Sequence, residues 1–149
     1  MNPDLPIHIL EGGKFVDTRG TLTFFNDFDM SKVKRFYRID HPQISVVRAW
    51  QGHKFEKKWF FVVKGSFLVA IVKPDNWEQP SRNERVQTFI LKENQQQILH
   101  VPGGYANGFK ALEPDSAIII FSDFTVTESA NDSFRFDNDY WFDWDRKDI

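Results

Sequence analysis

The side chains best suited to chemistry are basic, amide, acidic and phenol groups in three separate stretches of the sequence. They are Arg19 with Asp17, the group Arg48, Gln51, His53, Glu56 and Lys58, and the pair Tyr105 and Asn107. An imidazole can accept a proton near neutral pH, an ammonium can stabilise a developing negative charge, and guanidinium groups bind phosphate through paired hydrogen bonds. If the three stretches meet in one barrel mouth, they predict an anion-binding site that can also move protons.

The expected strands would position two of these groups. Gln51 and His53 are two residues apart, so on an extended strand their side chains point to the same side. Lys58 shares its register with Phe60 and Val62, which puts its amine near an apolar floor. Burial there would lower the pKa of Lys58 and favour proton transfer or oxyanion stabilisation. A surface His and Lys at a strand end are the alternative from these residues alone.

The composition favours strands throughout. The chain has 16 Phe, 5 Trp and 3 Tyr, many of them beside Val and Ile in short runs. Residues 33–39 alternate so that both faces carry polar groups, which predicts a strand beside a wet cavity. We also expect two short strands joined at 17–20, a central hairpin over 58–72 with its turn at Lys64–Ser66, strands at 86–91, 98–102 and 116–124, and a glycine turn over 103–109. About eight such strands predict an all-β sandwich, jelly roll or barrel.

The length of 149 residues predicts one domain over 1–149. Its C-terminal arm, about 127–149, mixes acids with aromatic residues. We expect the arm to wrap over the body or over a second subunit, with a loosely packed terminal arm as the alternative and a short turn of helix within it.

Charge and composition exclude several classes of function. The net charge of −2 leaves no basic stripe for nucleic acid, and the absence of Cys excludes disulfides and thiolate metal sites. No apolar segment approaches the roughly 20 residues that span a bilayer. The sequence therefore predicts a cytoplasmic protein with no nucleic-acid or membrane partner.

Five stretches in order resemble the signature stretches of one known group of enzymes. They are DTRGTL, VKRFYRI, VRAWQGH, the lysine seven residues before Gly65, and VPGGYANGF. Together they look like the cupins that act on dTDP-4-keto-6-deoxyhexoses, which are the dTDP-4-dehydrorhamnose 3,5-epimerases and the related 3,4-ketoisomerases. The resemblance covers residues from about 15 to 138. It implies a cupin jelly-roll β-barrel, a nucleotide-sugar ligand and a homodimer.

The resemblance also implies roles for single residues. The proton-abstracting His of the 3,5-epimerases corresponds to Gln51, which cannot take a proton. The 3,4-ketoisomerases carry a His-x-His there, and this chain keeps the second as His53. Lys58 resembles the lysine that stabilises the enolate, and Tyr37 matches a tyrosine of the ketoisomerases. Arg19 and Arg48 match positions that hold the nucleotide diphosphate or the sugar.

Other positions depart from the family pattern. Asn107 replaces a His of the epimerases, and Phe124 replaces their tyrosine acid. Metal-binding cupins would need imidazoles where this chain has Gln51 and Asn107 beside His53 and Glu56, so we expect no metal and no cofactor. Three other histidines, namely His8, His41 and His100, are scattered, and we expect them to be structural or exposed.

Three hypotheses follow for the function. The leading one is metal-independent epimerisation or isomerisation by proton abstraction next to the carbonyl, with His53 as base, Lys58 as enolate stabiliser and Tyr37 as acid. The expected substrate-binding residues are Arg19, Arg48, Gln51, Tyr105 and Asn107. The second is a catalytically degenerate cupin that binds a nucleotide sugar as an accessory protein in polysaccharide biosynthesis. The third is a structural barrel without a small ligand.

Overall fold

The computed structural model of the chain describes residues 6–147, which form twelve strands and one short helix. The elements in chain order are β1 (His8–Glu11), β2 (Gly13–Asp17), β3 (Gly20–Phe24), β4 (Arg35–His41), β5 (Val47–His53), β6 (Lys58–Lys64), β7 (Ser66–Val72), β8 (Val86–Lys92), β9 (Gln97–Val101), β10 (Tyr105–Ala111), β11 (Ser116–Ser122), α1 (Val126–Ala130) and β12 (Phe134–Arg135). The all-β class is confirmed. Over these residues no helix is long and apolar enough to cross a membrane.

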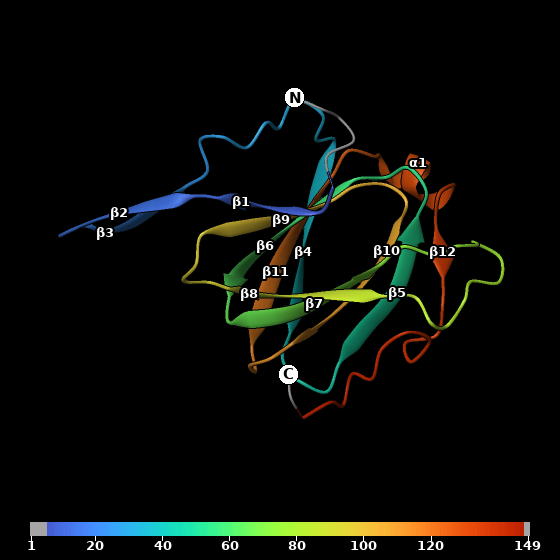
Figure 1. Cartoon of the computed structure of the whole chain (residues 1–149). Coiled ribbons are helices and arrows are strands. Elements are labelled where there is room, and N and C mark those ends of the chain that lie inside the picture. The colour runs from blue at the N-terminus through green and yellow to red at the C-terminus, as the bar shows by residue number, and fades with distance from the viewer. Residues whose placement is uncertain (1–5, 148–149) are drawn as a thin grey trace.

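Ten of the strands form two antiparallel sheets that enclose the core (Figure 1). The strand order is β1-β9-β6-β11-β4 in the first sheet and β12-β5-β10-β7-β8 in the second. Along the chain, the strands β4, β6, β9 and β11 of the first sheet are thus interleaved with β5, the hairpin of β7 and β8, and β10 of the facing sheet. This exchange between sheets is the jelly-roll arrangement.

The core lies between the two sheets. Its buried side chains come from β6, β9 and β11 on one side and from β7, β8 and β10 on the other. They are Phe60, Val62, Phe67, Val69, Ile71, Leu91, Leu99, Val101, Phe109, Ala111, Ile118 and Ile120. Burying such side chains supplies most of the drive to fold, at about 1.5–3 kcal/mol for each large one.

The expected hairpin over residues 58–72 is wrong. Strand β6 pairs with β9 and β11, whereas β7 pairs with β8 and β10, so the chain changes sheets at Gly65. Gly65 has a φ of +72°, and a Cβ there would lie 2.0 Å from Oγ of Ser116. The corner therefore needs glycine. Both strands are apolar on both faces because each is central in its own sheet, as expected, and not because they pair.

The expected glycine turn over residues 103–109 is also wrong in its extent. Strand β10 begins at Tyr105, and the turn is confined to the residues before it. Small residues within β10 serve close packing instead. A Cβ on Gly108 would lie 2.6 Å from Cβ of Ala49 and 2.8 Å from the indole of Trp144.

The described chain beyond α1, residues 131–147, packs on the outer face of the second sheet, over the body of the same chain. Trp141, Phe142 and Trp144 are buried in a cluster with Trp50 and Leu68. The β2–β3 hairpin behaves differently, because its two strands pair only with each other and project from the barrel (Figure 1). Three apolar side chains of the hairpin stay 59–61% exposed, namely Phe15, Val16 and Leu22.

Candidate active site

A cavity of about 600 Å³ between the two sheets collects most of the predicted site residues. Six predicted residues line it: Tyr37, Arg48, Gln51, His53, Lys58 and Asn107. The remaining lining residues are Arg35, Ile39, Val47, Ala49, Trp50, Phe109, Ile120, Ser129 and Arg135. The structure therefore brings the imidazole, the amine and a guanidinium of the sequence prediction into one hollow.

Strand β4 supplies one wall through its alternation. Arg35, Tyr37 and Ile39 are half-buried and line the cavity, whereas Phe36 and Arg38 between them are exposed. The prediction that this strand borders a wet cavity is confirmed. The expected apolar floor near Lys58 is present as well, because core residues such as Phe109 also line the cavity.

His53 is held in one tautomer. Its Nδ1 lies 2.7 Å from the backbone carbonyl of Asp132, and a carbonyl can only accept, so Nδ1 carries the proton of the neutral ring. Nε2 is buried without a hydrogen-bond partner among residues 6–147. Burial lowers the pKa of His53, the charge of Lys58 lowers it further, and Glu56 opposes both. The ring is therefore neutral near pH 7 and has an unpaired basic nitrogen.

Asp132 also fixes the backbone on which His53 sits. Its carboxylate accepts hydrogen bonds from the backbone N–H groups of Lys54, Phe55 and Glu56 at 2.8, 2.9 and 2.8 Å. The residue is buried, at 5% exposure. One side chain from the C-terminal arm therefore holds the first three residues of the connection between β5 and β6, and Asp123 accepts from the backbone N–H of the fourth, Lys57, at 2.7 Å.

Glu56 puts a buried negative charge behind the imidazole. Its Oε1 accepts a hydrogen bond from Ser129 at 2.6 Å and lies 3.3 Å from Nδ1 of His53. Its Oε2 accepts from Ser122 at 2.6 Å and from Nη2 of Arg35 at 3.4 Å. A carboxylate in this place stabilises an imidazolium that forms when His53 takes a proton.

Lys58 and Tyr37 both hold a proton at neutral pH. Burial lowers the pKa of Lys58 to about 8, with Glu56 opposing the shift and Arg35 adding to it. The amine is therefore cationic in most molecules at pH 7. Burial raises the pKa of Tyr37 to about 12, although the guanidinium of Arg35, 4.9 Å from the ring centroid, opposes the shift.

Two amide side chains also line the cavity. Gln51 on β5 and Asn107 on β10 are direct partners across the sheet, and both line the cavity. An amide donates and accepts hydrogen bonds but does not titrate, so these two residues can orient a ligand and cannot move its protons.

Two predicted residues lie outside the cavity. The side chain of Arg19 is 85% exposed at the tip of the β2–β3 hairpin, paired with Asp17 at 2.6 Å. Tyr105 is half-buried against the core, with the amine of Lys73 6.0 Å from its ring centroid. The expected meeting of all three stretches in one mouth is therefore wrong within a single chain: the first stretch stays on the hairpin, which points away, and the third reaches the cavity through Asn107 but not through Tyr105, which packs inward.

The sequence prediction missed the three other polar or charged lining residues, namely Arg35, Ser129 and Arg135. Arg35 lies two residues before Tyr37, a predicted site residue, and therefore shares its strand face, which was the available signal. Ser129 and Arg135 come from the C-terminal arm, and Arg135 reaches the site because it pairs with Gln51 across β12 and β5. No local sequence pattern predicts a pairing between residues as far apart in the chain as Gln51 and Arg135.

His100 does not replace the missing base at position 51. It is buried on the outer side of the first sheet, with its ring centroid 4.8 Å from Trp59 and 5.2 Å from His8. Burial lowers its pKa to about 4, and the charge of His8 contributes. In the described part of the chain, no group of three or more His, Cys, Asp or Glu side chains could hold a metal ion.

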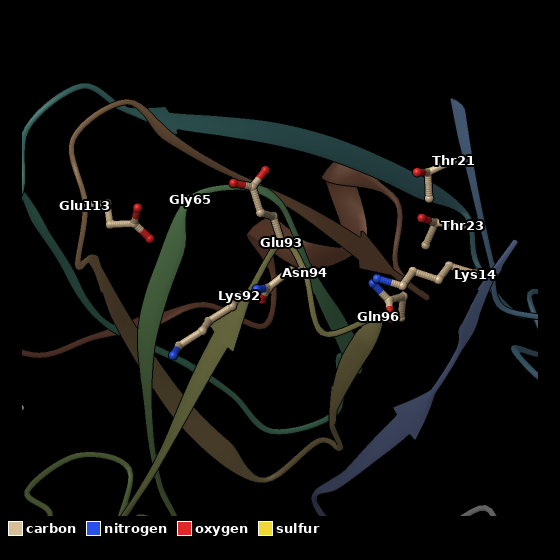
Figure 2. Close-up of a pocket in the computed structure, with 9 residues that line it drawn as sticks. All are labelled: Lys14, Thr21, Thr23, Gly65, Lys92, Glu93, Asn94, Gln96 and Glu113. Atoms are coloured by element: carbon tan, nitrogen blue, oxygen red, sulfur yellow. The ribbon is translucent and has the colours of Figure 1, made fainter. Parts of the chain in front are cut away.

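A second hollow, of about 440 Å³, lies between the β2–β3 hairpin and the turns at one end of the barrel (Figure 2). Its ionisable residues are Lys14, Lys92, Glu93 and Glu113, which are all exposed and mixed in charge. It contains none of the predicted site residues. The first cavity is therefore the candidate active site.

Comparison with known proteins gives a relative in sequence. No family model matches the chain. The probable low-salt glycan biosynthesis epimerase Agl13 of Haloferax volcanii is 32% identical over 110 residues, which cover 70% of this chain and 68% of the relative.

Solved structures agree on the fold. A dTDP sugar isomerase from Desulfovibrio desulfuricans matches with a TM-score of 0.73 at 20% identity, over 95% of this chain and 92% of that one. The rmlC epimerase of Mycobacterium tuberculosis matches at 0.74 and 18% identity, over 95% and 76%. The sugar 3,4-ketoisomerase QdtA of Thermoanaerobacterium thermosaccharolyticum, in complex with TDP, matches at 0.69 and 16% identity, over 90% of each chain. The expected cupin jelly roll is confirmed, and the chain belongs to the cupin family of dTDP-4-dehydrorhamnose 3,5-epimerase-like and dTDP-sugar 3,4-ketoisomerase-like proteins.

Proposed function

We propose that the protein is an isomerase that epimerises or isomerises a dTDP-4-keto-6-deoxyhexose without a metal. The observation that carries this function is the unpaired Nε2 of His53 in the same cavity as the Lys58 ammonium. A neutral base and a fixed cation are what proton abstraction next to a ketone requires. The family membership supports the substrate class.

The proposed chemistry begins at a carbon next to the C4 carbonyl. Nε2 of His53 takes the proton, the C–H electrons form a carbon–carbon double bond, and the carbonyl electrons move to the oxygen as an enolate. Lys58 stabilises that oxygen, and Glu56 stabilises the imidazolium. Return of a proton from Tyr37 or from His53 to the carbon that lost it gives the epimer. For the shifted ketone the proton is lost from C3, the C3 hydroxyl proton passes to the C4 oxygen, and the returning proton goes to C4, so that the carbonyl forms at C3. Solvent then exchanges protons with Tyr37 and His53 to restore both groups.

Arg48, Gln51 and Asn107 are the proposed ligand-binding residues of the cavity. Arg48 is exposed at the mouth and suits a diphosphate, because a guanidinium binds phosphate oxygens in pairs. QdtA, which shares the fold, was solved in complex with TDP. Arg35 and Arg135 add positive charge to the same hollow, which favours an anionic ligand.

A homodimer is the state we propose in solution. The β2–β3 hairpin exposes Phe15, Val16 and Leu22, and an isolated two-stranded hairpin is marginally stable in water. A second copy would cover it and could carry Arg19 to the neighbouring cavity. Sedimentation of wild type and Leu22→Glu tests this proposal: we expect a dimer that the charge converts to a monomer, and a wild-type monomer would contradict it.

The experiment for the reaction is proton exchange in D₂O. With dTDP-4-keto-6-deoxyglucose, NMR should show loss of the C3 or C5 proton signal. His53→Asn should slow this exchange on the order of 10²- to 10⁴-fold while dTDP still binds in calorimetry. Absence of exchange under conditions in which an authentic 3,5-epimerase works would end the catalytic proposal for this substrate.

The second candidate function is nucleotide-sugar binding without turnover. It is motivated by Gln51, Asn107 and Phe124, which are incapable of proton transfer where the resemblance implies proton-handling groups. Heat of binding with dTDP, together with no exchange, would favour this accessory role. No heat at all would count against both.

A further inference from the structure

A buried histidine outside the cavity is bonded to an arginine of the cavity. His41 ends β4 and is 1% exposed. The Nε of Arg48 donates a hydrogen bond to Nε2 of His41 across 3.1 Å. Because the guanidinium Nε can only donate, Nε2 of His41 carries a lone pair, and the neutral ring has its proton on Nδ1.

The surroundings of His41 favour this neutral form. Its ring packs edge-on to Phe67 on β7 and stacks on Phe109 on β10, with centroid distances of 5.3 and 5.8 Å. Ser116 is its partner across β11, and Arg48 on β5 is the charged group that faces it. Burial lowers the pKa of His41, and the Arg48 charge lowers it further. The ring therefore remains an acceptor for Arg48.

A purely structural role does not account for an imidazole in this place. Nδ1 of His41 is buried without a hydrogen-bond partner among residues 6–147. An unpaired buried N–H destabilises the folded state, and a phenylalanine would fill the same space without one. The hydrogen bond to Arg48 is the interaction that a phenylalanine could not make.

We propose that His41 is a positioning residue that holds Arg48 by its Nε and leaves the two terminal amino groups to bind an anionic group at the cavity mouth. The inference rests on the proposed function, because it takes that group to be the diphosphate of a nucleotide sugar. A guanidinium fixed in advance loses less conformational freedom on binding. His41 does not line the cavity, so it acts through Arg48 and not on the reacting atoms.

Calorimetry with dTDP tests the proposal on four variants: His41→Phe, His41→Gln, Arg48→Ala and the double variant His41→Phe with Arg48→Ala. We expect His41→Phe to weaken dTDP binding about three- to tenfold, since one hydrogen bond is lost. His41→Gln should restore binding, because its amide oxygen can accept from Arg48. The phenylalanine should add no loss to Arg48→Ala, because the two residues act as one unit.

Two further measurements, of the kinetic constants and of the melting temperature, distinguish a positioning role of His41 from a purely structural one. KM should rise in His41→Phe with kcat unchanged, and its melting temperature should equal or exceed that of wild type, because the unpaired N–H is gone. Unchanged dTDP affinity in His41→Phe, beside weakened Arg48→Ala, would overturn the positioning role and leave the proposed function intact. An equal loss in the Arg48→Ala background would also overturn it.

A wild type that gives no heat with dTDP would overturn the proposed function instead. The bond itself is then tested by NMR of the Arg48 Nε–H. Slower hydrogen exchange in wild type than in His41→Phe supports the role of His41, and equal exchange overturns it.

Discussion

His41 and His53 are both buried, and they are the last residues of the successive strands β4 and β5. Their rings nevertheless make hydrogen bonds through different nitrogens. His53 donates from Nδ1 to a carbonyl and keeps Nε2 unpaired, with the Glu56 carboxylate beside it. His41 uses Nε2 to accept from the cationic Arg48 and keeps Nδ1 unpaired. A carboxylate neighbour favours gaining a proton, whereas a guanidinium neighbour opposes it. The charge of the neighbouring side chain therefore distinguishes His53, the candidate base beside a carboxylate, from His41, the positioning residue beside a guanidinium.

The largest expected effect comes from removing the base. His53→Asn keeps a donor for the Asp132 carbonyl and lacks Nε2, so proton exchange in D₂O should fall on the order of 10²- to 10⁴-fold. The affinity for dTDP should change little. The comparison predicts the reverse in His41→Phe, with affinity reduced and exchange at saturation unchanged. Equal loss of both properties in both variants would erase the distinction, and His8→Asn, outside the cavity, is the matched control.

The next largest effect is expected from removing the charge of Glu56, the carboxylate that lies beside His53 and has no counterpart beside His41. Glu56→Gln leaves Arg35 without its buried ion-pair partner, and breaking such a pair typically costs about 3 kcal/mol of unfolding free energy. Exchange should also fall, because the imidazolium loses its stabilising charge. Urea denaturation and D₂O exchange measure the two effects.

Glu128→Gln is the control for that prediction. Its carboxylate is 43% exposed and pairs with Lys34 at 2.8 Å, and glutamine can still close the capping box at the start of α1. Exposed ion pairs contribute little to stability, so this variant should be nearly as stable as wild type. Similar losses in both variants would show that Glu56 contributes no more than a surface charge.

The same contrast shows what the sequence can predict. Period-two alternation predicted that Tyr37 and Arg35 share one face of a strand beside a wet cavity, and the spacing of Gln51 and His53 predicted that their side chains point to the same side. These are local patterns, fixed by strand geometry. The pairing of β6 and β7 with other strands, and the approach of Asp132, Ser129 and Arg135, depend on contacts between residues far apart in the chain. A residue name also does not state which ring nitrogen is bonded, so His41 and His53 look alike in the sequence.

A third buried histidine, His100, extends the comparison to the pH dependence of the unfolding free energy. His100 has neither the carboxylate of His53 nor the bond of His41, and its pKa is lowered to about 4. Its unfolded form binds a proton near pH 6.5, so the folded state loses stability as the pH falls below that value. The loss at pH 5 should be roughly 2 kcal/mol from this residue.

His100→Phe should remove that contribution. Urea denaturation at pH 7.5 and pH 5 should show a smaller acid loss in the variant than in wild type. His8→Asn, whose ring lies beside His100, serves as the matched control and should keep most of the loss. An acid loss that is the same in His100→Phe and wild type would mean that the proton is taken up elsewhere.

The smallest expected effects are the pH dependence of kcat/KM, which reports His53 as the base, and the pH dependence of dTDP affinity, which reports His41 as the positioning residue. The value of kcat/KM should rise to a plateau as His53 loses its proton, with that limb below pH 6.5 because its pKa is lowered. It should fall again above pH 8 as Lys58, with a pKa of about 8, loses the charge that holds the enolate. Each limb approaches about tenfold per pH unit. Affinity for dTDP should instead weaken only on the acid side, where His41 gains a proton and repels Arg48.

Lys58→Arg separates these limbs, because arginine stays charged across the measured range. The alkaline fall in kcat/KM should disappear, while the acid limb of His53 and the acid weakening of dTDP binding remain. His41→Phe should flatten only the affinity curve, since it removes the group that titrates behind Arg48. An alkaline limb that persists in Lys58→Arg would assign that proton to another group, and an affinity curve unchanged by His41→Phe would place the acid effect outside the pair.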